Sequence, residues 1–332
     1  MSNKTNSFEF SAFQVGKRLT IPSLGGCSST IHSFEERDAW AVMAAMYAGR
    51  PLLLRGEPGT GKTQLAQAAA HILKRNLLTT VVQSRTEWQD LLWQIDPVER
   101  LSMAHVIKNT QESNAEDLAP KNFLTPGPLW YALNWESAEK KRCRFPAWVP
   151  PPPPKDWKKE DGVVMLIDEI DKAEPELANA LLEVFGQGAF RVPALDEIIS
   201  STEGAKAPLV IITTNEEREL PKAFLRRCLV LQLGLPKKQQ ALINYLSDRG
   251  QMHFPKLDTR SSKQIYISAA EQLLRDREAA EEAGQVKPGQ AEYLDLLRVL
   301  NTLKEEGQDP QLWLNRVLPY TYQKGPEAKQ QD

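Results

Sequence analysis

The segment at residues 56–63, GEPGTGKT, constrains the fold more than any other feature of this sequence. It matches the pattern G-x-x-x-x-G-K-[ST] in full, and it lies between an apolar run at 51–54 and a helical pattern that begins at Gln64. A glycine loop between a strand and a helix turns backbone N–H groups inward as a nest for phosphate oxygens, and the helix adds its positive end. The alternative is a plain glycine turn, which accounts less well for the complete motif and its flanks.

All eight residues of this loop are candidate phosphate ligands, and two of their side chains have distinct tasks. Lys62 is expected to reach the β- and γ-phosphates, and Thr63 to supply a hydroxyl to Mg²⁺, a hard ion that takes few protein ligands. The sequence therefore predicts ATP and Mg²⁺ as cofactors. The predicted nucleotide-binding residues are Gly56, Glu57, Pro58, Gly59, Thr60, Gly61, Lys62 and Thr63.

Unbroken apolar runs farther along the chain indicate strands that are buried on both faces of a parallel sheet. These runs lie at 163–167, 209–213 and 229–233, and a further strand is expected at 79–83. Strands of this kind alternating with helices specify an α/β doubly wound sheet, in which ligands bind at the carboxyl edge. After Pro236 only helical patterns follow, so a helical second domain is expected from residue 235; the patterns lie at 239–246, 263–277, 290–303 and 311–317.

Two carboxylates and an amide follow these strands at the expected ligand edge. Asp168 fits the acidic residue that holds Mg²⁺ in phosphate-transfer sites, and Glu169 fits the base that orients an attacking water on the γ-phosphate. Asn215 follows the run at 209–213 and is placed to hydrogen-bond that water or the γ-phosphate. The alternatives are an N-cap role for the two acids and a turn-forming role for Asn215.

Arg226 and Arg227 lie beyond Asn215, at the end of the short segment 221–225. An arginine there does not easily serve its own nucleotide. In a ring, however, it reaches the site of a neighbouring subunit and stabilises charge on the transferring phosphoryl group, as an arginine finger. The alternative is a solvated surface arginine.

Composition disfavours several other classes of protein. The 332 residues are 25% charged and 41% apolar with a net charge of −2, which is typical of a globular protein without general attraction to nucleic acid or to an anionic membrane. The three cysteines form no C-x-x-C pair and the four histidines are scattered, so neither a metal site nor a disulfide framework is expected. No segment has the apolar character of a signal peptide or a membrane span, and we expect a cytoplasmic protein.

Two segments are expected to lie outside the regular layers. Residues 1–32 predict an N-terminal extension, and residues 135–161 predict a basic, proline-rich insertion that favours polyproline II. We interpret the insertion as a stiff solvated surface loop, with a docking segment for a partner as the alternative. The predicted division of the remaining chain is a nucleotide-binding domain at 33–234, a helical lid domain at 235–318 and a flexible tail at 319–332.

The glycine loop, the acidic pair, Asn215 and the arginine pair, in this order, resemble the AAA+ ATPases, and further segments resemble the MoxR branch. The resemblance spans about residues 34–305, and its nucleotide motifs are more specific than its branch motifs. A segment at 186–193 resembles the first half of a hairpin that precedes the sensor strand in this family. The branch motifs are QSR at 83–85, FLTPGPL at 123–129, DEIDKA at 168–173, LPKAFLRR at 220–227 and KPG at 287–289.

The resemblance implies a P-loop NTPase fold with five parallel strands in the order 5-1-4-3-2, a C-terminal helical lid, a hexameric ring of identical subunits and a partner with a von Willebrand factor A domain. It gives Asn215 the sensor 1 place and Arg227 the arginine finger place, with Arg226 as the near alternative. The chain departs from the family in two ways. The insertion is long, and no clear sensor 2 arginine lies near 289–291, where only Lys287 or Arg298 is close.

These features predict an ATPase that acts in an oligomeric ring to remodel, mature or activate a partner protein. Its predicted catalytic residues are Lys62, Glu169, Asn215, Arg226 and Arg227. A rival hypothesis is a regulatory switch that binds ATP to assemble a complex and turns over little, although Glu169 and an arginine finger favour hydrolysis. A third is a nucleic-acid-associated motor, which requires a basic DNA-binding element that we do not find in the sequence.

Overall fold

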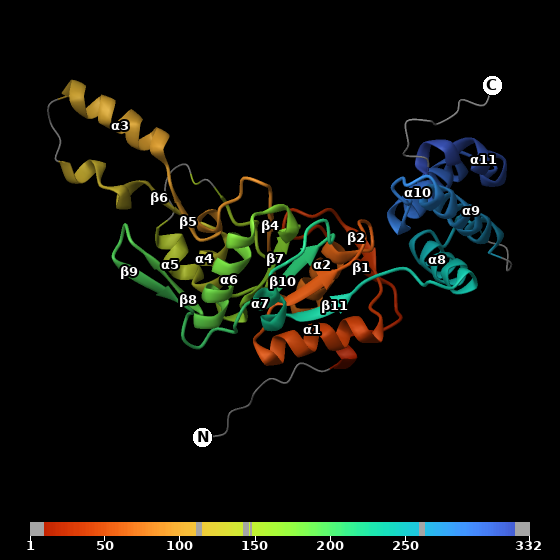
Figure 1. Ribbon diagram of the computed structural model, residues 1–332, viewed down its shortest axis with the longest axis horizontal. Helices are drawn as coiled ribbons and strands as arrows, with labels where there is room; N and C mark the ends of the chain where they lie inside the picture. The colour runs from red at the N-terminus through yellow and green to blue at the C-terminus, as the bar shows by residue number, and fades with distance from the viewer. Residues whose placement is uncertain (1–9, 111–114, 142–145, 147, 259–262, 323–332) are drawn as a thin grey trace, which may run out of the picture. The chain divides into compact units, whose positions relative to one another are not determined.

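The computed structural model describes residues 10–110, 115–141, 146, 148–258 and 263–322 (Figure 1). The chain divides into two compact units. The first consists of Met1–Arg55 and Thr63–Gln232, and the second of Gly56–Lys62 and Leu233–Asp332. The longer of the two segments of the second unit begins at Leu233, whereas the sequence predicts a boundary at residue 235. The shorter segment is the glycine loop up to Lys62.

A parallel five-stranded sheet forms the centre of the first unit (Figure 1). Its spatial order is β11-β3-β10-β7-β4. Numbered along the chain, this order is 5-1-4-3-2, so the predicted α/β P-loop NTPase fold is confirmed. The strands are β3 (Leu52–Arg55), β4 (Asn76–Val81), β7 (Val163–Asp168), β10 (Leu209–Thr214) and β11 (Leu229–Gln232).

Both faces of the sheet are buried along its central strands β3, β10 and β7, as the apolar runs predict. One face forms a single apolar cluster with α4 (Pro128–Leu133) and α6 (Pro175–Gln187), through side chains such as Trp130 and Leu181. Its strand residues include Leu53, Leu78, Met165, Ile167 and Ile212. The other face carries Leu52, Leu54, Leu77, Leu166 and Ile211, all fully buried. Helix α1 (Glu36–Ala48) contacts β3 and β11, and α2 (Lys62–Leu73) connects β3 to β4.

Two antiparallel hairpins extend the first unit. β8 (Ala189–Val192) pairs with β9 (Glu197–Ser200), in agreement with the hairpin inferred from residues 186–193. β5 (Trp93–Ile95) pairs with β6 (Leu124–Pro126), and between them lie α3 (Pro97–Thr110) and two short 3₁₀ turns, Ala115–Leu118 and Pro120–Phe123. Strands of three residues are too short to give a recognisable alternation of apolar and polar residues in the sequence.

The predicted N-terminal extension packs against the first unit along its described part. A short 3₁₀ helix (Phe10–Phe13) precedes β1 (Leu19–Ile21), which pairs with β2 (Thr30–His32). Gln67 of α2 donates two hydrogen bonds to this segment, to the carbonyls of Pro22 (3.2 Å) and Ser28 (3.0 Å). Residues 1–9 of the extension lie outside the described residues.

The proline-rich insertion is not a solvated loop in its described parts, because aromatic side chains anchor it. It begins with α5 (Trp135–Lys140), and Trp135, Trp148 and Trp157 all pack on the apolar cluster of the sheet. The Trp157 indole donates to the carbonyl of Gly162 (2.8 Å), just before β7. Residues 142–145 and 147 of this insertion are outside the described part of the chain.

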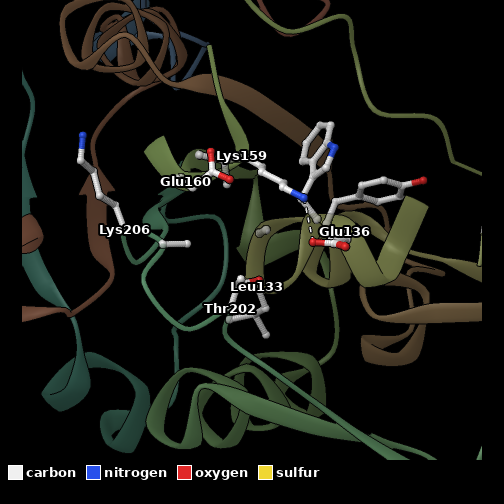
Figure 2. Close-up of a pocket in the computed structure, with 12 residues that line it drawn as sticks. Leu133, Glu136, Lys159, Glu160, Thr202 and Lys206 are labelled. Atoms are coloured by element: carbon white, nitrogen blue, oxygen red, sulfur yellow. Dashed lines mark hydrogen bonds and ion pairs between the residues drawn. The ribbon is translucent and has the colours of Figure 1, made fainter. Parts of the chain in front are cut away.

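A small pocket lies where the insertion returns to the sheet (Figure 2). Lys159 forms an ion pair with Glu136 of α5 (2.7 Å), and the hydrogen bonds from Lys159 and Lys140 lower the pKa of Glu136 to about 2. The pocket has a volume of about 30 Å³, which admits water but not a nucleotide. It is therefore not a candidate for the predicted ligand site.

The second unit is helical, as predicted. Its helices are α8 (Gln239–His253), α9 (Gln264–Glu282), α10 (Gln290–Glu305) and α11 (Pro310–Thr321), and their apolar faces share one core that includes Leu246, Leu273, Tyr293 and Leu297. Helix α11 continues past residue 318, where the lid was expected to end. Residues 323–332 of the predicted tail are not among those described. None of the helices in the described part of the chain has the length and apolar character needed to cross a membrane.

Candidate functional site

The glycine loop leaves β3 at Gly56 and enters α2 at Lys62. Gly56 has a φ of +150°, and a Cβ at this position would lie 2.1 Å from the carbonyl oxygen of Leu233, so no other residue fits. Gly61 has a φ of +90°, which also favours glycine. The Lys62 side chain is buried within the loop, where its ammonium donates to the carbonyls of Gly56 (2.7 Å) and Glu57 (3.0 Å). The Lys62 ammonium thus lies at the start of α2, where the helix backbone also favours a bound anion.

Asp168, at the end of β7, accepts hydrogen bonds from two hydroxyl groups. Thr63 Oγ1 donates to Asp168 Oδ2 (3.1 Å), and Thr213 Oγ1 of the neighbouring strand β10 donates to Asp168 Oδ1. Mg²⁺ binds through one or two carboxylates together with phosphate oxygens and water. One carboxylate and two hydroxyls fit that preference, and the structure brings the two predicted metal ligands, Thr63 and Asp168, into direct contact.

Glu169 is held by three neighbours at the same edge. Its carboxylate accepts from Asn215 Nδ2 (3.2 Å) and pairs with Lys172 Nζ (2.7 Å), and its backbone N–H donates to Thr213 Oγ1 (2.9 Å). Glu169 also has a φ of +61°, a left-handed conformation that is costly for a residue with a Cβ and that clusters at functional sites. The hydrogen bond to Glu169 raises the pKa of the Lys172 ammonium, so Lys172 remains charged.

Asp171 supports this arrangement, and sequence reasoning gave it no task beyond membership in the segment 168–173. It is almost fully buried, and its Oδ2 accepts from the backbone N–H groups of Asn215 (3.2 Å) and Glu217 (2.9 Å). These bonds fix the turn that follows β10. The signal was present in the sequence as a third acidic residue after the strand, but its partners lie more than forty positions away and no local pattern identifies them.

Arg55 and Glu216 form a second link across this edge that the sequence did not suggest. Arg55 ends β3, Glu216 follows Asn215, and the two form an ion pair. Ion pairs and hydrogen bonds between polar side chains therefore connect the ends of β3, β7 and β10. This places Thr63, Asp168, Glu169 and Asn215 in one connected network.

Arg226 and Arg227 do not join this network. They lie at the end of α7 (Lys222–Arg227), where both side chains are exposed. Among the residues that the structure describes, neither guanidinium group forms a hydrogen bond or an ion pair. Within the described part of the chain, both arginines therefore lie outside the network of Thr63, Asp168, Glu169 and Asn215.

The basic residues considered for the sensor 2 place are engaged elsewhere. Lys287 pairs with Glu281 (2.6 Å), and Arg298 pairs with Asp295 one helical turn away. Within the second unit, Arg277 of α9 contacts the glycine loop, with 3.1 Å between its Nη2 and Glu57 Oε2. Sequence reasoning missed Arg277, because α9 continues to Glu282 instead of ending near residue 277.

Comparison with known proteins gives a family and two similar structures. A candidate ATPase from Cytophaga hutchinsonii is 16% identical, with a TM-score of 0.36, over 85% of this chain and 78% of its own. A mutant of RuvB from Thermotoga maritima is also 16% identical, with a TM-score of 0.42, over 85% of this chain and 69% of its own. No curated protein matches the chain. The model of the AAA domain, dynein-related subfamily, matches residues 51–228, which is more than half of the chain and contains the glycine loop and both acidic residues. The protein therefore belongs to the AAA domain family, in its dynein-related subfamily.

Proposed function

We propose that the protein is a MoxR-like AAA+ ATPase that hydrolyses ATP in an oligomeric ring and uses the energy to remodel, mature or activate a partner protein. The observation that carries this proposal is the network of Thr63, Asp168, Thr213, Glu169 and Asn215 at the edge where the glycine loop begins. A site that only bound nucleotide would need the loop and the metal ligands. It would not need a second carboxylate positioned by an amide from the next strand.

Each residue of the site has a task in this reaction. Loop N–H groups and Lys62 bind the phosphates, and Thr63 and Asp168 hold Mg²⁺, which supplies positive charge to the phosphate oxygens when bound. Glu169 accepts a proton from the attacking water and orients it. Asn215 holds the Glu169 carboxylate in place through its 3.2 Å hydrogen bond. Lys62 turns from the loop carbonyls to the phosphates, which are the stronger acceptors.

The ring part of the proposal rests on Arg226 and Arg227. Their exposure on α7, outside the network of their own chain, supports a role at a neighbouring subunit's γ-phosphate. A hexamer is the form that the MoxR resemblance implies. Arg227 takes the arginine finger place, and Arg226 is the near alternative.

The proposed partner is a protein, and a von Willebrand factor A domain protein is the candidate that the MoxR resemblance offers. Helix α3, which projects from the β5–β6 hairpin in Figure 1, exposes Val98, Leu101 and Val106 by 70%, 62% and 56%. Apolar side chains exposed together on one helix are typical of protein contact surfaces. The net charge of −2 disfavours a nucleic-acid motor.

The first test of this function is the substitution Lys62→Ala. The loop loses its ammonium, and a hydrogen bond to a charged group contributes up to about 3 kcal/mol, so ATP should bind about 100-fold more weakly. Nucleotide titration by calorimetry or fluorescence measures this change. Lys237→Ala, which removes an exposed lysine of the second unit, is the matched control and should bind ATP like the parent. Parent-like affinity in Lys62→Ala would remove the nucleotide site from this loop.

One observation favours the regulatory switch as a second candidate function. Lys172 pairs with Glu169 Oε2 at 2.7 Å, and an ion pair on the proposed base holds it away from an attacking water. If this pair restrains turnover, Lys172→Gln should raise the steady-state rate of ATP hydrolysis, by at most about fivefold because the pair is partly exposed. A rate that falls instead would assign Lys172 to the active arrangement and would weaken the switch hypothesis.

A further inference from the structure

Arg50 connects the start of the sheet to the segment that carries the two exposed arginines. Its Nε donates to the carbonyl oxygen of Arg227 (3.0 Å), and its Nη2 donates to the carbonyl oxygen of Arg226. One guanidinium group therefore binds two successive carbonyls at the end of α7. Arg50 lies about 176 positions from these residues, so the contact belongs to the tertiary fold.

The backbone around Arg50 is fixed on both sides. Helix α1 ends at Ala48 and is capped by Gly49, whose φ of 61° is the left-handed cap conformation, and the Arg50 N–H donates back to the carbonyl of Ala45 (3.2 Å). The next residue, Pro51, accepts a hydrogen bond from the N–H of Leu229 (2.8 Å) as β3 begins to pair with β11. Arg50 thus projects from a rigid point toward α7.

The end of α7 needs such a partner. An α-helix leaves its last carbonyls without intrahelical donors, and its carboxyl end carries partial negative charge. Helix α7 has only six residues, and the charged donors of Arg50 satisfy the carbonyls of its last two. The backbone of Arg226 and Arg227 sets the directions in which their side chains leave the helix, so the contact with Arg50 limits where both guanidinium groups can reach.

The space beside this contact is open. A pocket of about 350 Å³ is lined by Arg50 and Arg227, with Leu182, Phe185 and Gly186 of α6 on its other side. Arg227 is therefore one of the residues that line this space. The next residue, Cys228, is buried and anchors the chain after the helix.

We propose that Arg50 is a positioning residue for hydrolysis: by holding the last two carbonyls of α7, it aims Arg226 and Arg227 at the nucleotide of the neighbouring subunit. This inference rests on the proposed function, because it requires that the two arginines act in trans. Arg50 itself touches no nucleotide in this account. It acts on the neighbour's site through α7, whose last two carbonyls accept its hydrogen bonds.

The variants Arg50→Ala and Arg50→Lys test this role. Arg50→Ala should bind ATP with the parent affinity but hydrolyse it more slowly by about tenfold or more, since a misplacement of about 1 Å can cost about 100-fold in rate. The loss should appear in kcat and not in the affinity for ATP. The hydrolysis rate of Arg50→Lys should lie between the rates of the parent and of Arg50→Ala. An ammonium can bind one carbonyl but lacks the planar group that binds both.

Arg100→Ala is the matched control for these variants. Arg100, within α3, also donates through Nε to a backbone carbonyl, that of Leu118, at 3.0 Å. The Arg100→Ala variant should hydrolyse ATP at the parent rate. If Arg100→Ala and Arg50→Ala slow hydrolysis equally, the effect of Arg50 is one of general stability and the proposal fails.

Mixing of variants separates an effect in trans from an effect on the subunit's own site. Subunits with Glu169→Gln should keep ATP and intact arginines, so mixing them with Arg50→Ala subunits should restore hydrolysis above the sum of the two separate rates. Mixing Arg50→Ala with Arg227→Ala subunits should restore nothing, because both lack a correctly placed arginine. The reverse pattern would show that Arg50 acts on its own chain's site and would overturn the inference.

The outcome also separates this inference from the proposed function. If the double variant Arg226→Ala/Arg227→Ala hydrolyses ATP at the parent rate, then the arginine finger itself is absent and the inference about Arg50 falls with it. If the double variant is slow but Arg50→Ala is not, then the proposed function stands and only the positioning role of Arg50 is refuted.

Discussion

Glu169→Gln is expected to bind ATP with the parent affinity and to lose hydrolysis by about 10²- to 10⁴-fold, the usual contribution of a positioned general base. Glutamine has the same size, and its amide oxygen can still accept the hydrogen bond that Asn215 Nδ2 donates to Glu169 at 3.2 Å. It cannot accept a proton from water. The site should therefore stay assembled, and the ATP-bound oligomer should accumulate.

Steady-state phosphate release and size-exclusion chromatography with light scattering measure these two effects. Glu176→Gln is the matched control, because Glu176 is an exposed acid in the first turn of α6, away from the network of the site. It should behave like the parent protein. An unchanged rate in Glu169→Gln would show that another group activates the water.

Removal of both arginines from α7 is expected to have the other large effect. Arginine fingers contribute about 10³-fold or more to the rate in the GTPases where they have been dissected, whereas an exposed arginine without a partner contributes almost nothing. Arg226→Ala/Arg227→Ala should bind ATP normally, because among the described residues neither guanidinium group forms a hydrogen bond or an ion pair with Asp168 or Glu169 of its own chain. Its hydrolysis should fall by about a thousandfold.

The single variants decide which arginine acts. Arg227→Ala should account for most of the loss if Arg227 is the finger, and Arg226→Ala should account for it if the assignment is reversed. Arg100→Ala serves as the control for the removal of an exposed arginine. A parent-like rate in both single variants and in the double variant would leave the regulatory switch as the better account of this protein.

The sheet could be predicted from the sequence because its central strands, β3, β7 and β10, are buried on both faces. These strands appear as apolar runs, and the predicted bounds of β7 and β10 lie within one residue of the observed bounds at either end. The prediction of β4 is less accurate, because the strand spans Asn76–Val81 whereas the sequence predicts a strand at 79–83. The strand begins with Asn76, a polar residue that is fully buried and whose amide donates to the carbonyl of Pro151 (3.4 Å), and a polar residue does not signal a buried strand end.

The insertion shows where composition misleads. Its prolines and lysines predicted a solvated loop, yet three tryptophans hold its described parts on the sheet. Trp135 and Trp157 stack edge to face with ring centroids 4.7 Å apart, and such pairs stabilise a fold beyond the area that they bury. Aromatic anchors act through contacts between segments, so a count of polar residues does not detect them.

The candidate site likewise contains some residues that the sequence identifies and others that it does not. Lys62, Thr63, Asp168 and Glu169 could be found from the sequence, because a phosphate loop needs glycines at fixed spacing and the acids follow a recognisable strand. Thr213, Lys172 and Arg50 could not. The roles of Thr213 and Arg50 depend on contacts with remote parts of the chain, and neither residue type alone carries a signal for such a contact. Lys172 pairs with Glu169 three residues before it, but a lysine near an acidic residue is too common to identify a site.

The most direct test of a shared active site is ATP hydrolysis by mixed rings. Glu169→Gln subunits have a silent site of their own and intact arginines, whereas Arg226→Ala/Arg227→Ala subunits have an intact site and supply no arginine. If the arginines act in trans, a mixture of the two near equal amounts should hydrolyse ATP well above the sum of the separate rates, because each intact site that faces an intact Arg226 and Arg227 regains activity. A mixture whose rate equals that sum, in samples that light scattering shows to be mixed oligomers, would contradict the proposal that neighbouring subunits complete the site.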